Sequence, residues 1–295
     1  MSTSDNNSTA LIQERVRGLR TALAVSGSSE ADIERRIATT LPHISHSSPP
    51  PPSSHQAVSS LIDHTVLKAD ATKADIQTLC REAHAHRFYS VCVNPYHVRT
   101  ALHCLNELSV HVFSSVKVAA VCGFPLGANT VAVKAAEARE LKELGAHEVD
   151  VVVNIAALQS GDAAYVLNEL TAVVQACQPL PVKVILETAL LSDAQIVDGC
   201  VLSALAGAAF VKTSTGFNAA GGASVAAVRL MRAVVGDRLG VKASGGIRDY
   251  PAARAMVEAG ASRLGTSASV AIAAGELAGG KQQQQHTAEG ASNAY

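Results

Sequence analysis

The chain has 295 residues, 48% of them hydrophobic, and a formal net charge of −1. This near-neutral balance gives no electrostatic basis for binding nucleic acid or an anionic membrane, and the sequence has no run of about 18 apolar residues that could cross a bilayer. The N-terminus does not resemble a signal peptide, and the six scattered cysteines lack a C-x-x-C pair. We therefore expect a cytoplasmic protein with reduced thiols, without nucleic acid or a membrane as a partner. An organellar transit peptide is the alternative, because Arg15, Arg17 and Arg20 stand in a serine-rich segment, although nearby acidic residues count against it.

The two ends of the chain differ in composition from the region between them. Residues 1–56 are predicted to form an N-terminal extension, in which weak helical patterns over Leu11–Leu23 and Ala31–Leu41 precede a proline- and serine-rich linker at residues 45–55. Residues 278–295 include four consecutive glutamines and have too few apolar side chains to pack, which predicts a disordered polar tail. The folded unit should span residues 57–277, and removing residues 1–56 is expected to leave it folded and active.

Between these ends, short apolar runs alternate with amphipathic segments at regular intervals. Glycines 145, 207 and 260 follow the third, fifth and seventh amphipathic segments, where a left-handed helix cap would stand. Eight strands, each followed by a helix, is the pattern of an α/β protein of the (β/α)8 TIM-barrel class. The predicted strands are 59–63, 88–93, 116–122, 148–154, 182–187, 208–212, 240–243 and 262–265, and the predicted helices are 72–86, 95–107, 130–144, 162–176, 192–205, 224–235, 250–259 and 267–274.

Two predicted strands carry a lysine at their carboxyl ends, where the active sites of such barrels lie. Lys212 follows the apolar run A-A-F-V, and Lys242 follows L-G-V. Burial lowers the pKa of an ammonium group, and a second cation beside it lowers that pKa further, so one of the two amines should be an uncharged nucleophile near neutral pH. Lys117 and Lys183 stand at strand beginnings, so we assign them to the opposite, stabilising end of the barrel. The alternative is that Lys212 and Lys242 are surface lysines with solvated ammonium groups.

A carboxylate near the lysines could move the protons that amine chemistry requires. Asp150 lies within the otherwise apolar strand E-V-D-V-V-V-N, so its side chain should face the barrel interior. An amine nucleophile can form an imine with a carbonyl substrate, and the imine then accepts the electrons of a breaking carbon–carbon bond. Alternatively, Asp150 is a structural partner of a lysine. Glu187, in V-I-L-E-T, is a second inward candidate for which a catalytic and a structural role are equally open.

The loops after the last two predicted strands suit a phosphate group. The segment S-G-G-I-R at 244–248 offers unobstructed backbone N–H groups, and L-G-T-S at 264–267 opens directly into a helix. Anions bind at helix N-termini, and barrels often hold a phosphate after strands seven and eight. A plain tight turn is the alternative. The predicted substrate-binding residues of these loops and of the loop after Lys212 are Thr213, Gly216, Gly245, Gly246, Arg248, Gly265 and Ser267.

The strand ends taken together resemble those of one known family. From residue 61 to about residue 274, in order and at every strand end, they are similar to the motif set of the deoxyribose-phosphate aldolase family. Matching motifs at every strand end are poorly explained by chance or by shared barrel ancestry. The segments that carry the resemblance are L-I-D-H-T-V-L-K (61–68), S-V-C-V-N-P (90–95), V-C-G-F-P-L-G (121–127), E-V-D-V-V-V-N-I (148–155), K-V-I-L-E-T (183–188), F-V-K-T-S-T-G-F (210–217), V-K-A-S-G-G-I-R (241–248) and L-G-T-S (264–267).

The resemblance implies a class I aldolase that interconverts 2-deoxy-D-ribose 5-phosphate with D-glyceraldehyde 3-phosphate and acetaldehyde, in deoxyribose and deoxyribonucleotide catabolism. It implies that Lys212 forms the Schiff base, that Lys242 perturbs it, and that Asp150 donates and accepts protons. Asp63 and Cys92 match family positions near the substrate hydroxyls and aldehyde. The expected partner is a small phosphosugar, with no cofactor.

Two further features of the family are left open by this sequence. Family members can place a C-terminal tyrosine in the active site, but the tail before Tyr295 shows no clear similarity, so Tyr295 is not included in the predicted site. The oligomeric state is also open, with a homodimer and a homotetramer as the candidates.

Two other classes of function compete with a Schiff-base enzyme. A metal-dependent aldolase needs a cluster of histidine and carboxylate ligands. Only His64 lies near a predicted strand end, whereas His84, His86, His97 and His103 fall in predicted helices, so we expect no metal. A catalytically silent barrel that only binds phosphosugars has no need of the two strand-end lysines and the carboxylate, which are all present.

Overall fold

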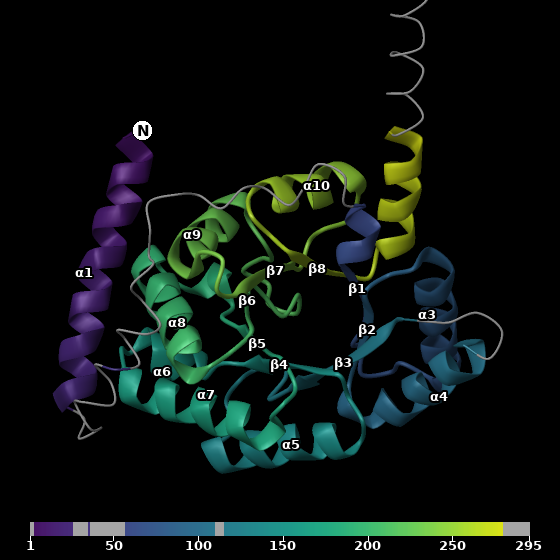
Figure 1. The fold of residues 1–295 in the computed structure, drawn as a ribbon, viewed down its shortest axis with the longest axis horizontal. Helices are drawn as coiled ribbons and strands as arrows, with labels where there is room; N and C mark the ends of the chain where they lie inside the picture. Colours follow the sequence, from purple (N-terminus) through teal and green to yellow (C-terminus); the bar gives the residue numbers. More distant parts are fainter. Residues whose placement is uncertain (1–2, 26–34, 36–56, 110–114, 280–295) are drawn as a thin grey trace, which may run out of the picture.

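Eight parallel strands close into a barrel in the order in which they occur along the chain (Figure 1). The computed structural model describes residues 3–25, 35, 57–109 and 115–279. The strands are β1 (Ile62–Val66), β2 (Ser90–Val93), β3 (Lys117–Cys122), β4 (Glu148–Val152), β5 (Val182–Ile185), β6 (Phe210–Lys212), β7 (Gly240–Ser244) and β8 (Arg263–Thr266). Neighbouring strands are hydrogen-bonded, and β8 pairs with β1 to close the ring. The predicted (β/α)8 barrel is therefore confirmed.

Helices connect the strands and cover the outside of the barrel. They are α3 (Lys73–His86), α4 (Val98–Ser109), α5 (Val131–Glu143), α6 (Ile155–Gln159), α7 (Ala163–Cys177), α8 (Asp193–Ala206), α9 (Val225–Val235), α10 (Tyr250–Glu258) and a last helix over 269–279. Capping boxes at Thr72 and Ser192 begin α3 and α8, and Gly207, with φ of 85°, ends α8. No helix in the described part of the chain has the length and apolar character needed to cross a membrane.

The strands carry different side chains on their two faces. Val91, Val149 and Val151 belong to the large apolar core between strands and helices. Cys92 belongs to a separate small cluster inside the barrel, and Asp150, between the two valines of β4, is fully buried. Because successive strand residues point to opposite faces, the residues that alternate with the outer valines line the barrel interior. Because polar and charged residues occupy these positions, we expect the active site in the barrel interior.

The first strand begins later in the chain than the sequence pattern predicts. Residues 59–61 belong to a short 3₁₀ helix, η1 (Val58–Leu61), and β1 begins at Ile62. The backbone N–H groups of Val58 and Ser59 donate to the carboxylate of Glu276, at 2.5 and 3.0 Å, and this contact fixes the turn before the strand. Asp63 is therefore the second residue of β1 and not its last, and it lies level with Gly265 of β8. The last helix also differs, since it covers 269–279 where 267–274 was predicted.

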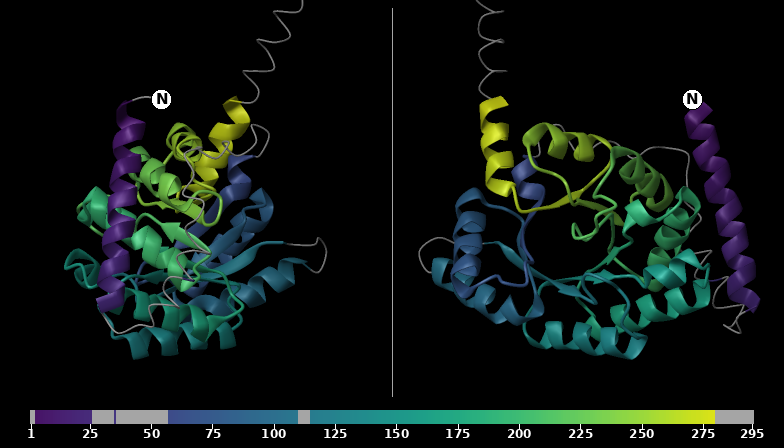
Figure 2. Two further views of the ribbon diagram at one scale, coloured as in Figure 1. Left: turned by 60° about the vertical axis from the view of Figure 1, so that its left-hand side comes forward. Right: turned by 180° about the vertical axis from the view of Figure 1, so that it is seen from behind.

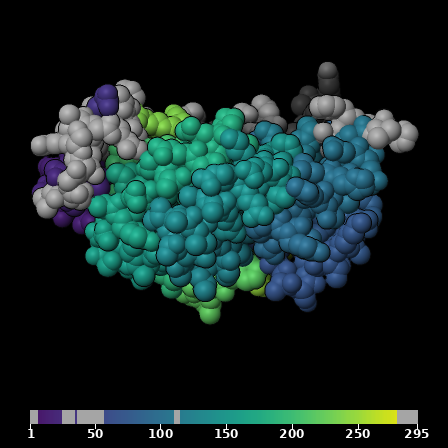
Figure 3. Space-filling model, turned by 90° about the horizontal axis from the view of Figure 1, so that it is seen from below, coloured from purple at the N-terminus to yellow at the C-terminus, as the bar shows by residue number. Residues whose placement is uncertain are grey.

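A long N-terminal helix, α1 (Thr3–Val25), packs on the outside of the helical ring. It lies beside α8 and also contacts α7 and α9 (Figures 1 and 2). Viewed from the side of α4, α5 and α7, the ring forms a continuous surface with α1 only at its edge (Figure 3). Leu19 of α1 is buried, and the guanidinium of Arg15 donates two hydrogen bonds to the Asp198 carboxylate, at 2.9 and 2.5 Å. Since α8 is buried along most of its length, α1 covers a face that would otherwise be open.

Several sequence predictions concern residues outside those described. The helical pattern over Ala31–Leu41 falls there except for residue 35, which is helical, and so does the proline- and serine-rich linker. The predicted tail falls there except for residues 278 and 279, which belong to the last helix, so Tyr295 lies outside the described residues. The division into extension, barrel and tail stays a prediction.

The packing of α1 on the barrel predicts that loss of this contact lowers the free energy of unfolding. Leu19 is 5% exposed, so Leu19→Ala should lower the free energy of unfolding by about 2 kcal/mol, at the lower end of the range for a buried leucine because the helix is peripheral. Chemical denaturation monitored by circular dichroism measures this change. Arg20→Ala, on the exposed side of the same helix, should leave the midpoint unchanged. Equal midpoints for the two variants would contradict the observed packing.

Candidate active site

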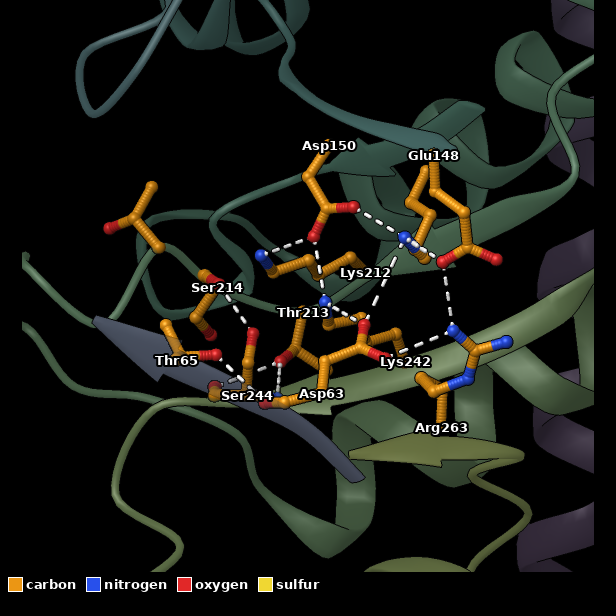
Figure 4. Close-up of polar contacts among 12 residues, drawn as sticks. Asp63, Thr65, Glu148, Asp150, Lys212, Thr213, Ser214, Lys242, Ser244 and Arg263 are labelled. Atoms are coloured by element: carbon orange, nitrogen blue, oxygen red, sulfur yellow. Dashed lines mark hydrogen bonds and ion pairs between the residues drawn. The ribbon is translucent and has the colours of Figure 1, made fainter. Parts of the chain in front are cut away.

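Two lysines meet one carboxylate inside the barrel (Figure 4). Oδ2 of Asp150 accepts hydrogen bonds from Nζ of Lys212 at 2.8 Å and from Nζ of Lys242 at 2.7 Å. Lys212 and Lys242 are directly paired in the register of β6 and β7, so their side chains leave the sheet at the same height. All three residues are buried, with exposures of 0% for Asp150 and Lys242 and 3% for Lys212. The structure thus brings together the three residues predicted to be catalytic, which excludes two solvated surface lysines.

A third lysine also reaches this carboxylate, contrary to the sequence analysis. Lys183 stands at the start of β5, as expected, but its side chain enters the barrel and is fully buried. Its Nζ lies 2.6 Å from Oδ1 of Asp150 and 2.6 Å from Oε2 of Glu148. Lys183 is paired in register with Asp150, and a lysine stem is long enough to bring the ammonium group from the strand to the barrel axis. The assignment of Lys183 to the opposite, stabilising end was therefore wrong, whereas Lys117 is exposed.

Three further charged residues complete the network, and two of them, Glu148 and Arg263, are not among the predicted site residues. Nη1 of Arg263 donates to Oδ1 of Asp63 at 3.0 Å and to Oε2 of Glu148 at 2.9 Å. Nζ of Lys242 donates to Oδ2 of Asp63, so Asp63 joins Arg263 to Lys242. The ring of Tyr89 lies 3.4 Å from the Arg263 guanidinium carbon. Glu148 could have been found from its spacing, because it precedes Asp150 by two residues and so lines the same face.

The number of charges in the network favours one neutral amine. The described interior holds four cationic side chains against three carboxylates, so the network is electrically balanced when one cation has lost its proton. Lys212 contacts one carboxylate, whereas Lys242 and Lys183 each contact two or more. On this count Lys212 is the group most easily deprotonated.

The pKa shifts of Lys212 and Lys242 agree with this charge count. Burial lowers the pKa of the Lys212 ammonium, and Lys242 lowers it further, against the opposing effect of Asp150. Burial also acts to lower the pKa of Lys242, but the carboxylates of Asp150 and Asp63 outweigh it and raise that pKa. Burial acts to raise the pKa of the Asp150 carboxyl, yet the three surrounding lysines hold it well below its usual value. The arrangement therefore favours loss of a proton from Lys212 over Lys242, and it keeps Asp150 an ionised carboxylate.

Cys92 lines the wall beside this network. It is fully buried in the small cluster with Leu67, Ala119 and Val121. Burial raises the pKa of its thiol, and the charges of Lys242 and Asp150 also act on it. Cys92 therefore contributes a neutral thiol to the interior, close to the lysines.

The predicted substrate-binding residues fall into two groups. Gly216, Gly246, Arg248 and Ser267 are exposed, and Gly245 is half-buried, in the loops after β6, β7 and β8. Gly216, Gly245 and Gly246 have φ of 82°, 85° and 80°, a left-handed conformation that glycine adopts without strain. A Cβ on Gly245 would lie 3.0 Å from Cα of Gly222 and 3.3 Å from Cα of Gly216, so the two loops approach closely at this glycine. These residues stand at the carboxyl end of the barrel, which is where a ligand of Lys212 would enter.

The other two predicted residues are inside the wall. A Cβ on Gly265 would lie 2.9 Å from Cε of Lys242, so this glycine makes room for the lysine. The hydroxyl of Thr213 donates to the carbonyl oxygen of Ser244 at 3.1 Å and accepts from its N–H at 3.0 Å. Thr213 thus joins the end of β6 to β7 beside the lysines, and Gly265 of β8 leaves room for the Lys242 side chain.

Glu187 fixes the loop after β6. Its backbone is in the left-handed region, with φ of 60°. Its carboxylate accepts a hydrogen bond from the hydroxyl of Thr215 at 2.5 Å and from the Thr215 N–H at 3.3 Å. These contacts give Glu187 a structural role close to Lys212.

Comparison with known proteins places the chain in one family. Residues 57–284 match the family described as DeoC/LacD family aldolase. The chain is 53% identical to deoxyribose-phosphate aldolase 1 of Vibrio vulnificus over 73% of its own length and 95% of that protein, and 53% identical to deoxyribose-phosphate aldolase of Brevibacillus brevis over 72% and 94%. Its structure is similar to the tetrameric deoxyribose phosphate aldolase of Aeropyrum pernix, with a TM-score of 0.67 and 32% identity over 83% of this chain and 97% of that one. With an aldolase family matched across the barrel and close relatives covered almost completely, this chain belongs to the DeoC/LacD aldolase family.

Proposed function

We propose that this protein is a class I aldolase that cleaves 2-deoxy-D-ribose 5-phosphate to D-glyceraldehyde 3-phosphate and acetaldehyde. The observation that carries the proposal is the single buried oxygen, Asp150 Oδ2, that Lys212 and Lys242 share at 2.8 and 2.7 Å. This arrangement supplies Lys212 as the nucleophilic amine and Lys242 as the cation that keeps that amine uncharged. Asp150 is then a base within reach of both lysines. Membership of an aldolase family and the names of the relatives support the same substrate.

In this mechanism Lys212 carries the substrate through the reaction. Its free amine attacks the aldehyde carbon C1 and forms a carbinolamine, which takes up a proton and loses water to give a protonated imine. Asp150 accepts the proton of the C3 hydroxyl while the C2–C3 bond breaks, and the bonding electrons move into the imine to form an enamine. Glyceraldehyde 3-phosphate leaves, C2 takes up a proton to regenerate the imine, and water then releases acetaldehyde. Lys242 remains an ammonium group that stabilises negative charge on Asp150.

The phosphate end of the substrate should lie at the rim of the barrel. Gly245, Gly246, Arg248 and Ser267 lie there in loops after β7 and β8, with Gly216 in the loop after β6. Exposed N–H groups of glycine-rich loops and a guanidinium are suited to a phosphate dianion. We include these five residues in the proposed site.

The setting of the enzyme forms part of the proposal. All six cysteines are free and buried, which suits the reducing cytoplasm. A homodimer or homotetramer is proposed, with the tetrameric relative from Aeropyrum pernix as support for the larger assembly.

Trapping with borohydride tests the proposal. Incubation with acetaldehyde and borohydride should reduce the imine to a stable secondary amine, adding one ethyl group to Lys212, because Lys212 is the least paired amine of the interior. Peptide mass spectrometry after proteolysis locates the adduct. Borohydride without acetaldehyde is the control and should leave the mass unchanged. An adduct on Lys183 or Lys242, or no adduct, would rule out the assigned nucleophile.

The cleavage rate after EDTA treatment tests the alternative of a metal-dependent aldolase. Among the residues that the structure describes, no group of three or more His, Cys, Asp or Glu side chains is arranged to hold a metal ion. We propose that cleavage persists after EDTA treatment. A loss of rate that Zn²⁺ restores would favour the metal-dependent enzyme.

A further inference from the structure

Three hydroxyl residues lie between the lysines and the carboxyl end of the barrel. In Figure 4, Thr65, Ser214 and Ser244 lie to the left of the Lys212 and Lys242 nitrogens, while Glu148 and Arg263 lie to the right. Ser244 is the last residue of β7, and a Cβ on Gly265 would lie 3.0 Å from its Cβ, which places it inside the barrel. The three residues therefore form the layer that a substrate attached to Lys212 must cross on its way to the rim.

The backbone carries Ser214 onto the same face as Lys212. The N–H of Thr213 donates to the carbonyl of Lys242, and the carbonyl of Thr213 accepts from the N–H of Thr188, so the strand ladder continues past the end of β6. In an extended segment every second side chain points to the same face. Ser214 is two residues from Lys212, and it therefore faces the barrel interior one step nearer the rim.

Of the three hydroxyls, that of Ser214 is the one kept without a partner. The hydroxyl of Thr65 donates to the carbonyl oxygen of Asp63 at 2.8 Å, and that of Ser244 donates to the carbonyl oxygen of Ser214 at 2.5 Å. Ser214 is 0% exposed, and its Oγ has no hydrogen-bond partner among the described residues. A buried hydroxyl without a partner is unfavourable, because the group gives up its hydrogen bonds to water and receives none in return. Such a group beside an active site is suited to bind a ligand.

The chemistry of the two substrate fragments decides which oxygen could be that ligand. This step rests on the proposed function. When acetaldehyde forms the imine and enamine on Lys212, its oxygen leaves as water, so the fragment held by the lysine carries no oxygen. In the direction of carbon–carbon bond formation, the aldehyde oxygen of the other fragment receives its proton from Asp150, in the layer of the lysines. The next oxygen toward the rim is the hydroxyl on the carbon adjacent to that aldehyde.

We propose that the Ser214 hydroxyl binds this adjacent hydroxyl, and that Ser214 thereby makes the enzyme selective for 2-hydroxyaldehyde acceptors. An acceptor that lacks this hydroxyl leaves the Ser214 hydroxyl without a hydrogen-bond partner, and it therefore reacts with a lower kcat/KM. Imine formation between Lys212 and acetaldehyde does not involve this hydrogen bond and should not change. Ser214 is thus a specificity residue, separate from the groups that form and break bonds.

The experiment compares two acceptors in the synthetic direction with acetaldehyde as donor. D-Glyceraldehyde 3-phosphate carries the adjacent hydroxyl, and 3-oxopropyl phosphate lacks only that group. Ser214→Ala should lower the kcat/KM ratio between the two acceptors by about 10-fold, the scale of one hydrogen bond in an enclosed site. Borohydride trapping of acetaldehyde on Lys212 should be unchanged. An unchanged acceptor ratio would overturn the proposal.

A matched control is present in the same barrel. Ser90, at the start of β2, is also 0% exposed with an unpartnered hydroxyl, and it shares its face with Cys92, but it lies level with Asp63 and farther from the rim. Ser90→Ala should leave the acceptor ratio unchanged, and an equal change in both variants would also overturn the proposal. The ratio is measured within one preparation, so a partly misfolded variant does not alter it. Failure of the proposed function would be seen separately, as the absence of an adduct on Lys212 in the unmodified enzyme.

Discussion

Lys212→Ala is expected to abolish cleavage of 2-deoxy-D-ribose 5-phosphate, with a loss of roughly 10⁴-fold or more in kcat, as expected when a covalent nucleophile is removed. Neither neighbouring lysine can replace it. Lys242 donates to both Asp63 and Asp150, and Lys183 lies 2.6 Å from both Asp150 and Glu148, so each stays an ammonium group. A coupled assay for glyceraldehyde 3-phosphate measures the rate, and borohydride trapping should give no adduct.

The control for this variant is another lysine on a barrel strand. Lys117 begins β3 but is exposed, with its Nζ 5.1 Å from the centre of the Tyr89 ring. Lys117→Ala should keep full activity. Turnover by Lys212→Ala above a tenth of the original rate, or a borohydride adduct on Lys242 in that variant, would show that another amine is the nucleophile.

Asp150→Asn should reduce kcat by about 100-fold or more while imine formation persists, because an amide cannot accept the proton from the C3 hydroxyl. The pH dependence of imine formation should change as well. Burial lowers the pKa of Lys212, and Asp150 is the largest influence that raises it again, so the substitution lowers that pKa further. A lysine is nucleophilic above its pKa, and the acidic limit of imine formation should therefore move to lower pH. Single-turnover trapping across a pH series, beside steady-state rates, separates the two effects.

A second carboxylate of the network provides the matched variant for Asp150→Asn. Glu148 contacts Lys183 at 2.6 Å and Arg263 at 2.9 Å but has no contact with Lys212 among those described. Glu148→Gln also leaves buried cations without an anion, so both variants should be less stable, by about 3–5 kcal/mol. Of the two variants, only Asp150→Asn should slow the proton-transfer steps and move the acidic limit of imine formation to lower pH. Equal losses of kcat in the two variants would mean that Asp150 has only a structural role.

Local patterns in the sequence were sufficient for the architecture and for the central residues of the candidate site. Strand and helix periodicities repeat along the chain, and parallel strands in such a series close with their carboxyl ends together. Lys212, Lys242 and Asp150 stand out because charged side chains are rare within apolar strands. Their meeting at one oxygen agrees with this reading.

Other parts of the molecule could be read only from the tertiary structure. A contact from Glu276 to Val58, 218 residues away in sequence, fixes where β1 begins and so places Asp63 within the strand. Lys183 reaches Asp150 because the two residues are paired in the register of β4 and β5. The spacing of residues in the sequence does not reveal this register. Likewise, α1 looked weakly helical because its stability comes from packing on α8. The sequence by itself determined which residues could do chemistry, since composition and periodicity are local; the closed barrel decided which of them meet, because contacts between distant segments depend on register, tilt and side-chain reach.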